Sequence, residues 1–262
     1  MEDDDEDIAE IEKEESEREP EPPALFLSKL HSVIQRQRVR CVVRCAHLKK
    51  NGKQDKLAVE VGAQFHAMEK YITKAIQKSI EGKKVWEDWG KHVKGLGAFS
   101  MGKLLGFIDI EKDVTVSKLW RYAGFMPGEK REAGEKLHFN MKLKSLCWRI
   151  AGNLLKAKGK YYLYYLQQKT AYQKRFGPEG ENLKIIPALK RKEQEGEIYE
   201  GHIHLMALRK MIKLFLSHLW AVWRTSEGLP VTQPYAIDKL EHQTYYEPFY
   251  DDDKSFDIMM KG

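Results

Sequence analysis

The chain is organised around the stretch Lys94-Gly95-Leu96-Gly97-Ala98-Phe99-Ser100-Met101-Gly102-Lys103-Leu104-Leu105. Its pattern is typical of a helix-hairpin-helix, with a short helix that ends at Val93, a Gly-Leu-Gly hairpin, and a second helix that begins near Ser100. Glycine permits left-handed backbone torsions and leaves no side chain in the way of a ligand. Leu96, between the two glycines, is expected to insert into the core. A tight turn between two helices, without a ligand, is the alternative interpretation.

A hairpin of this kind is suited to phosphate binding. Its N–H groups and those of the first turn of the next helix can point at one phosphate, with support from the helix dipole. Lysines beside the turn and a basic loop further along the chain would add positive charge. Because such contacts are made to the backbone of the nucleic acid, binding with little sequence preference is expected. The candidate DNA-binding residues are Lys94, Gly95, Leu96, Gly97, Ser100, Lys103, Lys130 and Arg131.

Charge is unevenly distributed along the chain. The 262 residues have a formal net charge of +6, but residues 1–21 hold 13 acidic side chains against two basic ones. The remainder therefore carries 43 basic and 26 acidic side chains, which favours a polyanionic partner. Solvated, lysine-rich helices are the alternative. We interpret the acidic stretch as a solubilising tail, with an intramolecular competitor for the basic part as the second interpretation.

The composition indicates an intracellular protein outside the membrane. No apolar run is long enough to span a bilayer, and the acidic amino terminus does not resemble a signal peptide. Three cysteines do not make a disulfide framework, which fits a reducing compartment. A cytoplasmic, nucleoid-associated or other intracellular location is therefore expected.

Apolar residues recur with helical spacing along most of the chain, which predicts an all-α helical bundle. Strand signals are nearly absent. The predicted organisation is a disordered acidic tail over 1–23, a helical hairpin over 24–82, a helix-hairpin-helix DNA-binding domain over 83–228 with a mobile insertion over 177–197, and an extended tail over 229–262.

Two further features bear on partners and cofactors. Between Lys156 and Arg175, basic residues are interleaved with five tyrosines, so stacking on single-stranded RNA is an alternative to ordinary packing of these rings. His202 and His204 do not share a helical face, which is poor geometry for a metal. The chain also contains no phosphate-binding Walker loop, serine elbow or metalloprotease helix. No metal, cofactor or catalytic residue is therefore assigned.

Three segments together resemble a known family. They are residues 95–106, residues 115–125 ending in Ala-Gly-Phe, and Asn140 with the helix that follows it. Over roughly residues 85–175 the chain resembles the carboxyl half of certain insertion-sequence transposases. In that family a RuvC-like amino domain with a DEDD acidic site is joined to a helix-hairpin-helix domain with a catalytic serine. The resemblance implies DNA binding and a relation to transposition.

The chain departs from this family at the positions that catalysis needs. The amino third has helical spacing where the family has alternating strands and helices. Ala133 stands where the catalytic serine is expected, and alanine cannot attack a phosphodiester. The sequence therefore predicts a non-catalytic DNA-binding protein, with self-association left open. An active transposase or recombinase that uses another site is the alternative.

Overall fold

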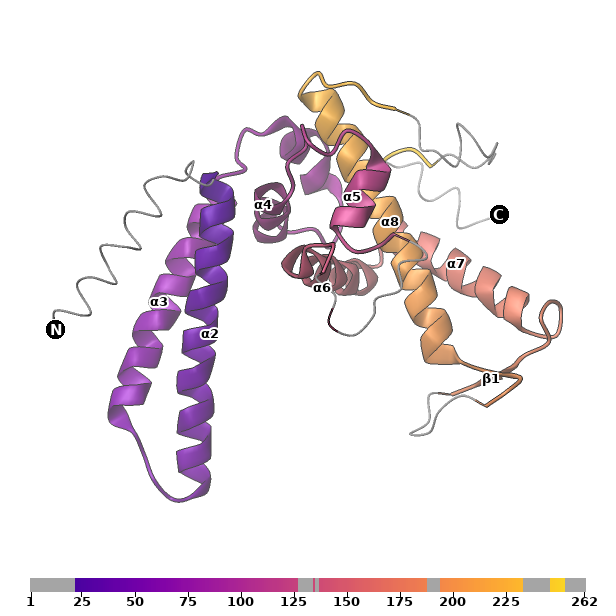
Figure 1. Ribbon diagram of the computed structural model, residues 1–262. Coiled ribbons are helices and arrows are strands. Elements are labelled where there is room, and N and C mark those ends of the chain that lie inside the picture. Colours follow the sequence, from indigo (N-terminus) through magenta and orange to yellow (C-terminus); the bar gives the residue numbers. More distant parts are fainter. Residues whose placement is uncertain (1–21, 127–133, 135–136, 188–193, 233–245, 253–262) are drawn as a thin grey trace. The chain divides into compact units, whose positions relative to one another are not determined.

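The computed structural model describes residues 22–126, 134, 137–187, 194–232 and 246–252. Most of these residues are helical, which confirms the fold class at that level (Figure 1). The chain forms two compact units, with the division between Ile76 and Gln77.

The first unit contains two long helices that run side by side in opposite directions, α2 (Pro23–Lys50) and α3 (Lys56–Lys78) (Figure 1). Gln35 Nε2 donates to Glu69 Oε1 at 2.9 Å, and Arg44 Nε donates to Asp55 Oδ2 at 2.7 Å. Glu69 also pairs with Arg38. Burial opposes ionisation of Glu69, but the hydrogen bonds from Arg38 and Gln35 outweigh it and hold the pKa of this carboxyl below its usual value.

The second unit begins with two short helical turns. η1 (Val85–Trp89) is a π-helical turn and η2 (Gly90–His92) is a 3-10 turn, and a bend at residues 93–97 leads into α4 (Ala98–Phe107). The short helix expected before the bend is thus present as two non-α turns. Trp89 is fully buried and anchors these turns in the core.

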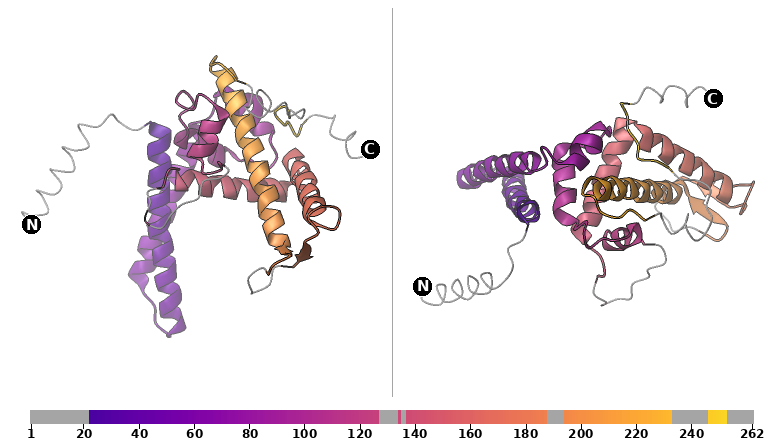
Figure 2. Two further views of the ribbon diagram at one scale, coloured as in Figure 1. Left: turned by 45° about the vertical axis from the view of Figure 1, so that its right-hand side comes forward. Right: turned by 90° about the horizontal axis from the view of Figure 1, so that it is seen from above.

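The long helix α8 (Glu200–Ser226) is the axis of the second unit. It packs against α5 (Val116–Tyr122), α6 (Met141–Ala157) and α7 (Lys160–Phe176), as Figure 2 shows from two sides. Arg224, near its end, is buried and donates from Nη1 to the carbonyl of Ile110 and from Nε to that of Pro230, each at 2.7 Å. The guanidinium therefore ties two loops to the axis.

Several helix ends lie where the sequence signals place them. Asn140 Oδ1 accepts the N–H groups of Lys142 and Leu143 at 3.0 and 3.1 Å, which confirms it as the cap of α6. Thr115 caps α5, because its hydroxyl oxygen accepts the N–H of Lys118. Gly124, with φ +73°, ends α5 as predicted.

Two short strands correct the expectation of a mobile insertion over 177–197. β1 (Lys184–Ile186) pairs in parallel with β2 (Glu197–Tyr199), and Ile185 lies opposite Ile198. Ile186 and Ile198 are both 5% exposed. Each strand thus buries one isoleucine, and three-residue strands are too short to give a periodic signal in the sequence.

Candidate phosphate-binding hairpin

The bend between η2 and α4 has the backbone that its two glycines suggest, but the two have different roles. Gly95 adopts φ +91°, a left-handed torsion that favours glycine. Leu96 is 5% exposed, so it inserts into the core as predicted, and its N–H closes the bend onto the carbonyl of Val93 at 3.1 Å. Gly97 is extended, with φ −87° and ψ 155°, and lies at the position that caps α4.

The absence of a side chain at Gly95 also allows the bend to pack closely on α6. A Cβ at this position would lie 2.8 Å from the carbonyl oxygen of Asn153 and 2.9 Å from the Cβ of Ala157, both on α6. At Gly97, by contrast, a Cβ would meet nothing within 4 Å. The open side of the hairpin is therefore at Gly97.

The beginning of α4 provides hydrogen-bond donors at this open side. The first-turn amides of Ala98 and Ser100 have no carbonyl partner within their own helix. Gly97 has no side chain and supplies no side-chain cap. The positive end of the helix dipole adds to the attraction for an anion. This end of α4 can therefore accept an oxyanion from outside the helix.

The lysines predicted to flank the bend are placed differently. Lys94 is exposed, as a phosphate contact requires. Lys103 is 2% exposed, and its Nζ lies 5.1 Å from the centroid of the Phe99 ring. It cannot supply surface charge, because α4 is buried on most of its faces, and its role as a DNA contact was wrongly predicted. Lys130 and Arg131 lie outside the described residues.

A carboxylate is bound beside the hairpin. Asp251 Oδ2 accepts the N–H of Lys94 at 2.7 Å, and its Oδ1 accepts the N–H of Lys160, in the first turn of α7, also at 2.7 Å. The backbone N–H of Asp251 donates to the carbonyl of His92 at 2.9 Å. The neighbouring Asp252 is hydrogen-bonded to Nδ1 of His92. The hairpin thus already binds an oxyanion through its backbone.

Further lysines lie at the end of α6 and directly after it, beside Ala157, which a Cβ on Gly95 would approach to 2.9 Å. Lys156 and Lys158 are exposed, and Lys158 adopts a left-handed backbone at φ 54°. Sequence reasoning assigned the basic residues here to tyrosine-flanked stacking. The sequence did not identify the start of α7 as a place that binds a carboxylate. The available signals were Gly159 before the helix and the acidic run near residue 251.

The tyrosines of α7 pack within the protein, which removes the basis for stacking on bases at the buried positions. Tyr161 is 1% exposed and its hydroxyl donates to His218 Nδ1 at 2.7 Å. Tyr165 is 6% exposed and is hydrogen-bonded to His204 Nδ1 at 2.6 Å. Burial raises the pKa of Tyr164 to about 12. The hydrogen bond from Tyr165 also means that Nδ1 of His204 already has a partner.

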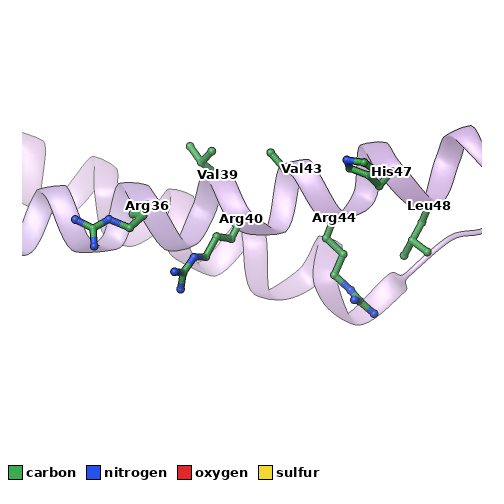
Figure 3. A pocket seen from close by; sticks show the side chains of 7 residues that line it. All are labelled: Arg36, Val39, Arg40, Val43, Arg44, His47 and Leu48. Carbon is green, nitrogen blue, oxygen red and sulfur yellow. The ribbon is translucent and has the colours of Figure 1, made fainter.

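Three arginines spaced four residues apart on α2 form an exposed, charged face, called here the arginine stripe. Arg36, Arg40 and Arg44 are exposed, and with Val39 and Val43 they border a depression of about 500 Å³ lined by α2 alone (Figure 3). A surface of one helix cannot enclose a small ligand, because ligand pockets bury most of the molecule they bind. The stripe remains a source of positive charge in the first unit.

Comparison of the chain with protein-family models, curated proteins and solved structures gives no match. Within the described ranges, no three His, Cys, Asp or Glu side chains are grouped so that they could hold a metal ion. No helix in the described part of the chain is both long and apolar enough to cross a bilayer. Function is therefore inferred from the geometry of the hairpin.

Proposed function

We propose that the protein binds DNA by contacting backbone phosphates through the hairpin of residues 93–97 and the first turn of α4. One observation supports this most strongly: the hairpin amide of Lys94 donates to a carboxylate oxygen at 2.7 Å. A phosphate oxygen is an acceptor of the same kind, and backbone amides at a helix start are a common phosphate site. Gly97 leaves room for the larger group.

The surrounding charge favours a polyanion over an isolated anion. Lys94, Lys156 and Lys158 are exposed on the hairpin or beside Ala157. Each lysine that neutralises a phosphate releases counterions, so affinity falls steeply as salt rises. Because the contacts are to the sugar–phosphate backbone, little discrimination among sequences is expected.

A duplex suits this site better than single-stranded RNA. Stacking on unpaired bases needs accessible aromatic rings. Tyr161 and Tyr165 instead lie in the core with their hydroxyl groups hydrogen-bonded to histidines. The proposed activity is binding without cleavage, in keeping with the alanine at position 133. The resemblance to transposases suggests that the DNA is a substrate of recombination.

Substitution of Gly97 tests this proposal. Gly97→Asp places a carboxylate over the first-turn amides of α4, where it caps the helix and repels a phosphate, so we expect DNA affinity to fall by about tenfold or more. Gly97→Ala is the matched control, because it adds only a methyl group in open space and keeps the amides accessible. Affinity is measured by fluorescence anisotropy with a labelled duplex at several salt concentrations.

The same substitution separates binding from folding. An aspartate at this position stabilises α4 or leaves it unchanged, so the thermal midpoint of Gly97→Asp is expected at or above that of the unmodified protein. Weaker binding together with an unchanged midpoint supports the proposal. If Gly97→Asp and Gly97→Ala bind the duplex equally well, the hairpin does not contact DNA.

A further inference from the structure

The carboxylate of Asp251 joins two elements that are distant in the sequence. One of its oxygens is held by the hairpin amide of Lys94, and the other by the amide of Lys160 in the first turn of α7, each at 2.7 Å. Gly159, which precedes α7, supplies no side-chain cap. The start of this helix is instead satisfied by a residue from the carboxyl-terminal segment.

The site is shaped for an oxyanion at the point where Gly159 has no side chain. A Cβ on Gly159 would lie 2.6 Å from Asp251 Oδ1 and 2.7 Å from Oδ2. Any other residue would push the anion away from the two amides. Two amides from separate elements therefore donate hydrogen bonds to the two oxygens of one carboxylate, as they would to two oxygens of a phosphate.

We propose that this composite site, formed by the amides of Lys94 and Lys160, is a phosphate site of the protein, and that residues 246–252 are an intramolecular competitor for it. The inference rests on the proposed function and adds its regulation. Asp251 occupies the site when nucleic acid is absent, and a backbone phosphate of DNA displaces it. Asp252, which pairs with His92, contributes a second negative charge to the same segment.

The segment is held by contacts that position Asp251. Phe249 packs on the rings of Tyr161 and His218, with centroids 5.0 and 4.9 Å away, and its carbonyl accepts the indole N–H of Trp89 at 3.1 Å. The carbonyl of Tyr246 accepts the Nε2–H of His218 at 3.0 Å. These contacts guide the carboxylate to the two amides.

The acidic end of the segment is the part suited to exchange. Asp251 is only half-buried, and the side chain of Asp252 is 65% exposed. Ionic contacts with this exposure are weakened by salt and are worth little individually. A polyanion that makes several phosphate contacts can therefore replace them, whereas a buried ion pair could not be replaced so readily.

Asp251→Asn in the full chain tests the competition, with Glu247→Gln as a matched control. Both substitutions remove one negative charge from the same segment, but Asp251 accepts the two amides, whereas Glu247 is exposed. Loss of the charge-assisted hydrogen bonds of Asp251 should tighten duplex binding by about tenfold, while Glu247→Gln should change it by less than about twofold. Equal affinities of the two variants would overturn the competition.

A second probe distinguishes failure of this inference from failure of DNA binding. Inorganic pyrophosphate is titrated into the unmodified protein and into Asp251→Asn while the amide NMR signals of Lys94 and Lys160 are followed. We expect both signals to respond in Asp251→Asn at about one-tenth of the concentration needed without the substitution. If pyrophosphate behaves in this way but no duplex binds, the composite site stands and the proposed function fails. If neither signal responds in either protein, the composite site is wrong.

The unmodified protein provides a test that does not depend on a variant. Saturation with duplex DNA should move the backbone amide signal of Asp251, because displacement of the acidic end breaks its hydrogen bond to the carbonyl of His92. This test remains available even where Asp251→Asn fails to fold. An Asp251 amide signal that stays in place at saturation would show that the acidic end and DNA bind together, which contradicts the competition.

Discussion

Replacing Gly95 with valine is expected to lower the free energy of unfolding by about 4 kcal/mol. The residue adopts φ +91°, where a β-branched side chain is strained. Its Cβ would also lie 2.8 Å from the carbonyl oxygen of Asn153, and a helical backbone cannot move aside as a flexible side chain can. Strain and overpacking therefore add at the same position.

Gly97→Val is the matched control, because the same side chain is introduced two residues away. Gly97 already has an extended backbone that valine adopts readily, and a Cβ there meets nothing within 4 Å. Its free energy of unfolding should stay within about 1 kcal/mol of the unmodified protein. Urea denaturation followed by circular dichroism measures both variants. Equal losses would show that the hairpin does not pack on α6.

Acid should destabilise the protein through His218. Its Nε2–H donates to the carbonyl of Tyr246, so Nδ1 accepts from the Tyr161 hydroxyl and the ring is neutral. Burial lowers the pKa of His218 to about 4. The unfolded chain binds a proton at pH values below about 6.5, whereas the folded protein does so only near pH 4. Stability is therefore lost as the pH falls through this window, by about 3 kcal/mol between pH 7 and pH 4.

A comparison with His218→Gln isolates this contribution. Glutamine can accept from Tyr161 and donate to Tyr246, and it does not titrate. The control is needed because burial and the nearby Asp109 raise the pKa of Asp113 to about 6, which affects stability in the opposite direction over the same pH range. The stability of the unmodified protein relative to His218→Gln, from urea denaturation at each pH, should decline by about 3 kcal/mol on acidification to pH 4. A difference that does not vary with pH would mean that His218 is not buried as a neutral ring.

Local signals in the sequence were sufficient to predict most of the helices and several of their ends. Apolar spacing marks the buried face of α6, and capping depends on a few neighbouring residues such as Asn140 and Gly124. The insertion of Leu96 into the core follows in the same way from its place between two glycines. These features depend on contacts within a few residues, so the local sequence predicts them.

Features that depend on distant segments could not be predicted in this way. Lys103 is buried because of the elements packed around α4, and nothing in its own neighbourhood indicates that. Gly95 lies against Asn153, so the residue that leaves no room for a side chain at this position belongs to another helix. An acidic competitor was considered only for residues 1–21, which lie outside the described residues. The structure instead places Asp251, near the other end of the chain, at the hairpin.

Backbone amide NMR during titration with duplex DNA tests the central claim most directly. The account predicts saturable shifts of the Ala98 and Ser100 amides in the first turn of α4, and their loss at high salt, because these N–H groups would donate to a phosphate. Shifts confined to the arginine stripe of α2, with the amides of α4 unchanged at saturation, would show that DNA binds elsewhere and would contradict the account.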